Sequence, residues 1–338
     1  MFVNTPLQSP DSQPFDYNLR PKTWQGYIGQ DKIKQTLEVM IKATQEREEP
    51  LDHILLYGSP GLGKTTLANL IAKEMGVHIF STSGPAIRKS GDLASILSNL
   101  NKGDILFIDE VHRLNNITEE MIYPAMEDFK MNIVVGKGPM AQTMEINLPP
   151  FTLIGATTKV ALLSSPFRSR FGATFQLSNY NKEEIKTILK NSANNLKIEI
   201  DNQACETIAA CSRSTPRIAN QILKRVRDFS QVDGQKIITK EAAKNALDFL
   251  EIDDLGLGIE DRKILQIIID KYRGGPVGIK SLSASSEEEE DTILDVYEPY
   301  LMQLGFLERT LRGRTATKAA YEYLKINYQD NESQNKLL

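Results

Sequence analysis

The stretch GSPGLGKT, residues 58–65, constrains the fold of this chain more than any other. It fits the pattern G-x-x-x-x-G-K-[ST], follows the apolar run HILLY, and precedes a segment with helical periodicity. The backbone N–H groups of such a loop and of the following helix can surround a phosphate. Gly61 and Gly63 allow that close approach. Lys64 would then contact the β- and γ-phosphates of ATP, and the Thr65 hydroxyl would contact Mg²⁺.

A second apolar run, ILFIDE at 105–110, ends in two adjacent carboxylates about 45 residues after the phosphate loop. The run predicts a buried strand whose end places both acids near the metal. Asp109 would hold Mg²⁺ through water, while Glu110 would orient and deprotonate the attacking water. Together the two motifs predict ATP hydrolysis rather than ATP binding alone.

Apolar runs alternate with helical periodicity along the first half of the chain, which predicts an α/β fold with a parallel sheet covered by helices. Runs that are apolar throughout are typical of strands buried on both faces. The expected strands lie at 53–58, 77–83, 104–110, 151–158 and 173–177. Residues 131–150 read as two extended arms around a GKG turn, which predicts a protruding hairpin.

The pattern becomes purely helical after Tyr180 and changes again near a Gly- and Asp-rich linker at 250–262. Helices expected at 262–272, 277–283 and 287–303 precede two short extended arms, an order typical of a winged helix. The predicted domains are a large ATPase domain at 1–180, a small helical lid at 181–254, and a winged-helix DNA-binding head at 255–338.

An acidic run, EEEED at 287–291, follows Ser285 and Ser286. Serines at a helix N-cap and carboxylates in the first turn both stabilise a helix, so these serines are expected to cap the helix 287–303. The last ten residues are polar and expected to fray.

The net charge of −4 excludes a globally basic nucleic-acid binder, so any DNA contact must be local. RTLRGRTATK at 309–318 is such a place, since Arg309, Arg312 and Arg314 lie around the turn at Gly313. Three neutralised phosphates per chain would give a slope of log K against log salt of roughly −2.7. The contacts would not depend on base sequence.

Other features narrow the class of protein. No run of about 18 apolar residues and no signal peptide are evident, which indicates a cytoplasmic protein without membrane spans. Cys205 and Cys211 are poorly spaced for a disulfide, and only three histidines occur, widely spread, so a catalytic zinc site is not expected.

Two arginines stand in unusual places. Arg170, in SSPFRSRFG, is expected in a loop between the fourth and fifth strands, from which an arginine can reach the γ-phosphate held by a neighbouring subunit. Arg217, in STPRIAN, follows an expected N-cap Thr215 and N1 Pro216. A cation in the first helical turn opposes the helix dipole, and a bound phosphate would offset that cost.

These motifs, taken in order, resemble the AAA+ ATPases, and within them the bacterial motors that drive Holliday-junction branch migration. The resemblance spans residues from about 15 to 325. It is carried by GSPGLGKTTLA, LFIDEVHRL, YPAMEDF, LIGATTK, LLSSPFRSRFG, STPRIANQ, GGPVGI, VYEPYL and GFLERTLRGRTAT.

The resemblance implies roles for individual residues around the nucleotide. Thr157 or its neighbour Thr158 would be the sensor of the attacking water or γ-phosphate, Arg170 the finger acting across the subunit boundary, and Arg217 the second sensor. The adenine would be bordered by Leu19, Arg20 and Tyr180, the phosphate loop would comprise Gly61, Gly63, Lys64, Thr65 and Thr66, and Glu127, Asp128 and Phe129 would lie near the inter-subunit nucleotide.

The resemblance also implies an assembly: a homohexameric ring on duplex and Holliday-junction DNA, acting in recombination, DNA repair and the SOS response. The hairpin 131–150 would dock the partner RuvA, and RuvC would join the complex that resolves the junction. One departure stands out, because many members of the family carry a DNA-contacting arginine near Glu290, where this chain has carboxylates.

Three other classes of protein share parts of this pattern. DEVH at 109–112 suggests a superfamily 2 helicase, but the glutamine-arginine-glycine motif of that class is absent from the sequence. A clamp loader shares the finger and the lid but ends in a helical collar. A DNA-binding regulator that uses ATP only to set its conformation would not need Glu110 and would turn over slowly.

Overall fold

The computed structural model describes residues 19–135 and 142–328 of the 338 residues. Contacts divide the chain into two compact units. One holds the described residues up to Glu199 together with Ser214–Leu223, and the other holds Ile200–Arg213 with the described residues from Lys224 onward. The chain crosses between the units at three places, one of which is the bond from Arg213 to Ser214.

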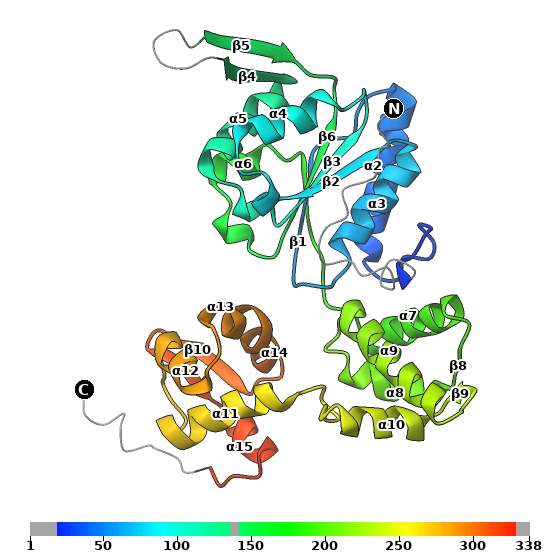
Figure 1. Ribbon diagram of the computed structural model, residues 1–338, viewed down its shortest axis with the longest axis vertical. Helices are drawn as coiled ribbons and strands as arrows, with labels where there is room; N and C mark the ends of the chain where they lie inside the picture. Colours follow the sequence, from blue (N-terminus) through cyan, green and yellow to red (C-terminus); the bar gives the residue numbers. More distant parts are fainter. Residues whose placement is uncertain (1–18, 136–141, 329–338) are drawn as a thin grey trace. The chain divides into compact units, whose positions relative to one another are not determined.

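Five parallel strands form the central sheet in the order β2-β3-β6-β1-β7, which confirms the predicted α/β fold (Figure 1). Tyr57 lies beside Thr157, so the ends of the central strands meet at one edge of the sheet. The strands are β1 (Ile54–Tyr57), β2 (Ile79–Ser83), β3 (Ile105–Asp109), β6 (Thr152–Thr157) and β7 (Ala173–Gln176).

The three central strands are buried on both faces, but the outer strands β2 and β7 are half-exposed. Full burial was therefore wrong for these two, which are the outermost strands of the sheet. Figure 1 shows α3 on one face of the sheet and α4 to α6 on the other. The helices of this part are α2 (Asp31–Arg47), α3 (Lys64–Met75), α4 (Ser90–Ser98), α5 (Asn116–Glu127) and α6 (Ser165–Ser169).

The predicted hairpin is present as β4 (Lys130–Val135) paired antiparallel with β5 (Gln142–Asn147). Met131 opposes Ile146 and packs into the core beside the sheet. The expected GKG turn at 136–138 lies outside the described residues. In Figure 1 the two strands extend away from the central sheet of the same unit.

The segment after Tyr180 is mainly helical, as predicted, with one small departure: the two-residue strands β8 (Glu199–Ile200) and β9 (Ile237–Ile238) pair. Three of its helices begin at side-chain caps, provided by Asn181, Asp201 and Thr239. The helices are α7 (Lys182–Asn195), α8 (Asn202–Cys211), α9 (Pro216–Val232) and α10 (Lys240–Phe249).

The last part has the predicted winged-helix order of helices followed by a two-stranded ribbon around its own apolar core. Its helices are α11 (Ile259–Tyr272), α12 (Ile279–Ser286), α13 (Glu290–Thr292), the π-helical segment Ile293–Tyr297, α14 (Glu298–Gln303) and α15 (Lys318–Tyr323), and its strands are β10 (Leu307–Thr310) and β11 (Gly313–Ala316). No described helix has the length and apolar character needed to span a bilayer.

The predicted role of the serines before the acidic run is wrong. Ser285 and Ser286 end α12, and the buried Ser286 hydroxyl donates to the Leu282 carbonyl at 2.9 Å within that helix. Glu287 takes the left-handed conformation that ends the helix, and the next helix starts only at Glu290. Two helices meet here because the chain must turn to bury Leu282 and Ile293 in one core.

Candidate active site

The phosphate loop runs from the end of β1 to the start of α3. Gly61 and Gly63 have φ values of 81° and 99°, a region that residues with a side chain rarely adopt. The Lys64 ammonium folds over the loop and donates to the carbonyls of Gly58, at 2.7 Å, and Ser59, at 2.9 Å. The predicted strand, loop and helix are therefore confirmed as a compact turn with a cation inside it.

A second cation reaches this turn from α9. A Cβ atom at Gly61 would lie 2.9 Å from Cβ of Arg217 and 2.7 Å from Cγ2 of Thr215, so α9 begins directly against the loop. Burial lowers the pKa of the Lys64 ammonium to about 8; Asp109 opposes the shift, and Arg217 adds to it. Two cations that destabilise each other beside a glycine-rich loop fit a polyanion such as a triphosphate.

The carboxylate at the end of β3 meets the first turn of α3. Thr65 Oγ1 donates to Oδ2 of Asp109 at 3.2 Å, and Oδ1 of Asp109 accepts from the Glu110 N–H at 2.9 Å. One carboxylate and one hydroxyl are the oxygen ligands with which proteins hold Mg²⁺ together with substrate phosphates. Within residues 19–135 and 142–328, no cluster of three or more His, Cys, Asp or Glu side chains could hold a metal by itself.

Glu110 has a strained backbone, with φ at 47°. Its carbonyl lies 2.5 Å from where a Cβ atom at Gly84 would be, so only glycine fits opposite it. The half-exposed Glu110 carboxylate forms an ion pair with the Arg113 guanidinium at 3.1 Å. Strain of this kind persists only where the surroundings fix it, and it gathers at functional sites. The role of Glu110 as the base stays a prediction.

The sensor threonines at the end of β6 differ in their surroundings. Thr157 is buried, and its hydroxyl lies 2.9 Å from Nδ1 of His112 and 2.9 Å from the Lys159 N–H. Thr158 is exposed. Which of the two senses the nucleotide stays a prediction, but the link from Thr157 to His112 was not expected from the sequence.

An aromatic pair supports the loop from the other side. The Tyr180 hydroxyl donates to the Leu62 carbonyl at 3.1 Å and lies 3.5 Å from the Tyr27 hydroxyl. Tyr27 in turn lies 3.0 Å from the position of a Cβ atom at Gly63. The sequence had indicated Tyr180 but not Tyr27, whose position has no motif of its own. Leu19 is buried and Arg20 half-buried, and their adenine contacts stay predictions, as does the role of Thr66.

Comparison with protein-family models covers the described chain almost end to end. The matching models are the Holliday junction DNA helicase RuvB P-loop domain at residues 19–177, the RuvB AAA lid domain at 180–253, and the RuvB C-terminal winged helix domain at 254–325. The chain belongs to the RuvB family. It is thus an AAA+ P-loop ATPase, which confirms the resemblance drawn from the motifs.

Individual relatives agree. The chain is 55% identical over 332 residues to the Holliday junction branch migration complex subunit RuvB of Thermomicrobium roseum, covering 98% of this chain and 94% of that protein. The RuvB subunit of Dehalococcoides mccartyi is 54% identical over 323 residues, covering 96% and 93%. A solved structure, the Thermotoga maritima RuvB Holliday junction branch migration motor, matches with a TM-score of 0.84 and 49% identity, covering 92% of this chain and 100% of that one.

Arg170 lies away from the phosphate loop of this RuvB-family chain. It ends α6 three residues before β7, which starts at Ala173 beside Ile54, the first residue of β1. The loop instead follows Tyr57, at the other end of β1, about 10 Å of strand further on. Arg170 forms a 3.1 Å ion pair with Glu127, and its guanidinium lies 4.2 Å from the centre of the Tyr123 ring.

The two residues after Glu127, Asp128 and Phe129, have structural positions in this chain. Asp128 ends α5, and Phe129 adopts a φ of 52° and packs its ring edge-on against Phe151, 6.0 Å between centres. Their expected proximity to a nucleotide held between subunits stays a prediction.

The wing of the winged-helix head is the ribbon of β10 and β11, and the position of Arg314 on it differs from the prediction. This side chain is buried, and both its Nε and Nη2 donate to Oε2 of the buried Glu298, at 3.1 and 3.0 Å. Its backbone also pairs with Val277, which makes β11 the inner strand of the ribbon. Arg314 therefore does not face solvent, and the prediction that it faces a phosphate backbone needs correction. Arg309 and Arg312 are exposed.

Proposed function

We propose that this chain is an ATP-driven motor that moves duplex DNA and drives branch migration at Holliday junctions in the cytoplasm, in recombination and repair. Its ATPase site would be completed by a second subunit. The observation that carries the proposal is the separation of Arg170 from the phosphate loop along β1. In a motor built in this way, rapid hydrolysis would need an interface between two subunits, and the resemblance to the family implies six subunits in a ring.

The residues of one subunit would bind and prepare ATP. Lys64 and Arg217 would neutralise the phosphates, and Glu110 would take the proton from the attacking water. Thr65 and Asp109 would hold Mg²⁺. Its positive charge would neutralise the negative charge that develops on the phosphate oxygens in the transition state. Glu110 would leave its ion pair with Arg113 to act as the base.

Arg170 of the neighbouring subunit would stabilise the charge on the γ-phosphate. In the described chain its guanidinium is held by the Glu127 carboxylate, the Tyr123 ring and the Pro166 carbonyl, and 21% of the side chain is exposed. An arginine finger supplied in this way can raise the hydrolysis rate on the order of 10³-fold or more.

The wing would hold DNA through Arg309 and Arg312, with contacts to the phosphate backbone that do not depend on base sequence. Two neutralised phosphates per chain would give a slope of log K against log salt of roughly −1.8, smaller than that expected for three. So modest a grip would leave loading onto the junction to a partner.

That partner would be RuvA, docked on the hairpin β4–β5, with RuvC joining the complex that resolves the junction. The hairpin stands out from its unit, and Met144 on β5 is more than half exposed, an apolar side chain suited to a protein contact (Figure 1).

A branch-migration assay tests the proposed function. A synthetic four-way junction with mobile arms is incubated with RuvA, ATP, Mg²⁺ and the chain. We expect ATP-dependent conversion to duplex products, lost in Lys64→Ala and in Arg170→Ala but retained in the matched control Arg225→Ala, a surface arginine of α9 paired with Asp228. Junctions that stay intact with the unmodified chain, while DNA and ATP both bind, would contradict the proposal.

A further inference from the structure

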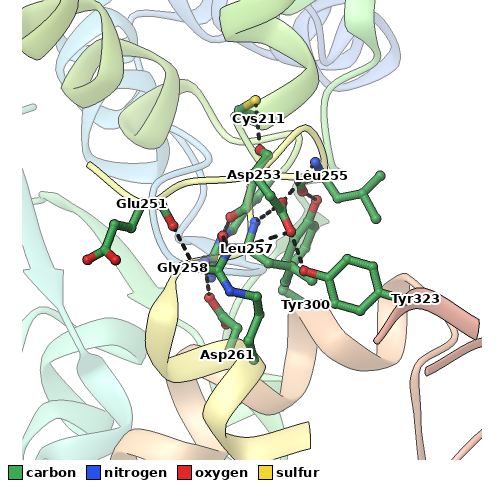
Figure 2. A network of polar contacts seen from close by, with 12 residues as sticks. Cys211, Glu251, Asp253, Leu255, Leu257, Gly258, Asp261, Tyr300 and Tyr323 are labelled. Carbon is green, nitrogen blue, oxygen red and sulfur yellow. Dashed lines mark hydrogen bonds and ion pairs between the residues drawn. The ribbon is translucent and has the colours of Figure 1, made fainter. Parts of the chain in front are cut away.

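The predicted Gly- and Asp-rich linker between the lid and the winged helix is held in place by side-chain contacts. Asp253 organises it (Figure 2). Oδ1 of Asp253 accepts from the N–H groups of Leu255, at 2.9 Å, and Leu257, at 2.8 Å. Oδ2 accepts the hydroxyl of Tyr323 in α15, and the Asp253 carbonyl accepts the thiol of Cys211 in α8 at 3.2 Å. One residue thus ties the lid to the head.

A second tie is made by Arg213, just after α8. Its Nη2 donates to Oδ2 of Asp261 at 2.5 Å, its Nε donates to the Gly256 carbonyl at 2.9 Å, and its guanidinium lies 4.9 Å from the centre of the Tyr300 ring. Asp261 is only 1% exposed, so removal of Arg213 would leave its carboxylate buried without an ion-pair partner. The Tyr300 hydroxyl donates to the Leu255 carbonyl at 2.5 Å, and burial raises its pKa to about 12.

The backbone at this place is strained. Arg213 and Ser214 have φ values of 52° and 55°, and they are the only two consecutive non-glycine residues with positive φ in the described chain. Each such residue costs on the order of 1–3 kcal/mol and persists only where its surroundings fix it. Gly256 is part of that fixing, because a Cβ atom there would lie 2.4 Å from the Cys211 carbonyl oxygen.

The residues that follow Arg213 in the sequence contact the phosphate loop and its neighbour Tyr180. The Ser214 carbonyl accepts from the Tyr180 N–H at 3.0 Å, and Thr215 and Arg217 lie against Gly61 of the phosphate loop. Five residues of chain, 213–217, therefore connect side chains of the head to the phosphate loop. The bond between Arg213 and Ser214 is also a point where the chain passes from one compact unit to the other.

We propose that Arg213 is a positioning residue that couples the nucleotide state sensed at Arg217 to DNA binding by the winged helix. It does so by fastening the head, through Asp261 and Tyr300, to the strained turn that precedes α9. The inference rests on the proposed function, since a motor must change its hold on DNA with each nucleotide state. A change at the phosphate loop would shift the turn at 213–214, and the fastened head would move with it.

The test compares DNA affinity in two nucleotide states of the full-length chain. Duplex DNA binding is measured with a non-hydrolysable ATP analogue and with ADP. We expect the two affinities to differ at least fivefold in the unmodified chain, within the usual range for coupled sites. In Arg213→Ala the ratio should fall below about twofold, while ATP-analogue binding stays within twofold of the unmodified chain. The control Arg225→Ala should keep the full ratio.

Loss of Arg213 leaves Asp261 buried without its cation, so misfolding needs a separate check. The double variant Arg213→Gln with Asp261→Asn replaces the ion pair by a neutral one of similar shape, and it should also lose the ratio while melting near the unmodified temperature. A ratio that survives in both variants overturns the inference alone. A ratio near one in the unmodified chain overturns the proposed function, and the inference with it.

Discussion

At the scale of single residues, Lys64 shows how burial and charge prepare a site for ATP. Its ammonium lies inside the phosphate loop, held by two backbone carbonyls and opposed by Arg217. Because the folded pKa lies below the usual 10.5, the unfolded chain binds more protons between about pH 8 and 10.5. In the protein without nucleotide, burying this charge lowers the free energy of unfolding, and that cost disappears as pH rises through this window.

ATP should bind the charged form of Lys64. We expect the dissociation constant of an ATP analogue to rise about tenfold between pH 7.5 and 9, since the ammonium loses its proton above a pKa of about 8. Binding titrations across this range measure the effect. Lys64→Arg keeps a permanent charge and should bind more weakly but without the inflection. An affinity that is flat up to pH 9 in the unmodified chain would contradict the assigned environment.

Replacing Arg314 and replacing Arg312, both on the β10–β11 ribbon, should affect different properties: local stability for Arg314 and DNA binding for Arg312. Arg314→Ala leaves Glu298 buried beside only the distant Arg309, at 4.0 Å, so we expect a loss on the order of 3–5 kcal/mol of local stability. Hydrogen exchange at the amides of β10 and β11 measures it.

Arg312→Ala is the matched control for Arg314→Ala. Its side chain is exposed, so hydrogen exchange at the amides of β10 and β11 should not change. The slope of log K against log salt for DNA binding should become smaller in magnitude by roughly 0.9. Equal exchange in the two variants would show that the buried ion pair does not hold the wing.

At the scale of elements, local patterns predicted the strands well because each central strand is short, apolar and followed by a motif. They did not reveal contacts between residues that lie far apart in the sequence. Asp253 contacts Cys211 and Tyr323, which are 42 and 70 residues away, so the composition of the linker could not show that it is held in place. Arg314 was misjudged for a similar reason, since its partners Val277 and Glu298 belong to other elements.

The start of α9 against the phosphate loop is an element-scale feature that can be tested with one methyl group. In Gly61→Ala the new Cβ would meet Thr215 and Arg217 at under 3 Å, so we expect the affinity for an ATP analogue to fall at least about tenfold. Gly76→Ala is the control, because Gly76 has a similar φ of 71° but its Cβ would meet nothing within 4 Å. That variant should lose roughly 1–2 kcal/mol of stability, because alanine is strained in this left-handed conformation, and keep its affinity.

Equal ATP affinity in Gly61→Ala and Gly76→Ala would show that α9 does not rest on the loop when nucleotide binds. The comparison separates close packing from backbone conformation, since both glycines have positive φ.

At the scale of the whole molecule, the residues predicted to form the ATPase site lie at opposite ends of the strands of one sheet. Lys64, Asp109 and Glu110 follow the carboxyl ends of their strands, while Arg170 precedes the amino end of β7. The sequence motifs named all four residues, but only the strand order shows that Arg170 and the phosphate loop lie at opposite ends of two neighbouring strands. That separation is the central claim of the account.

Mixing two inactive variants tests this claim most directly. Arg170→Ala should bind ATP but not hydrolyse it, and Lys64→Ala should bind ATP poorly while still offering Arg170 to a neighbour. Steady-state ATPase rates are measured on mixtures over a range of ratios with duplex DNA, with assembly checked by light scattering. We predict that activity returns in the mixtures and is highest near equal amounts, because some interfaces then hold an intact loop and an intact Arg170. Co-assembled mixtures that remain as inactive as either variant alone would contradict the account.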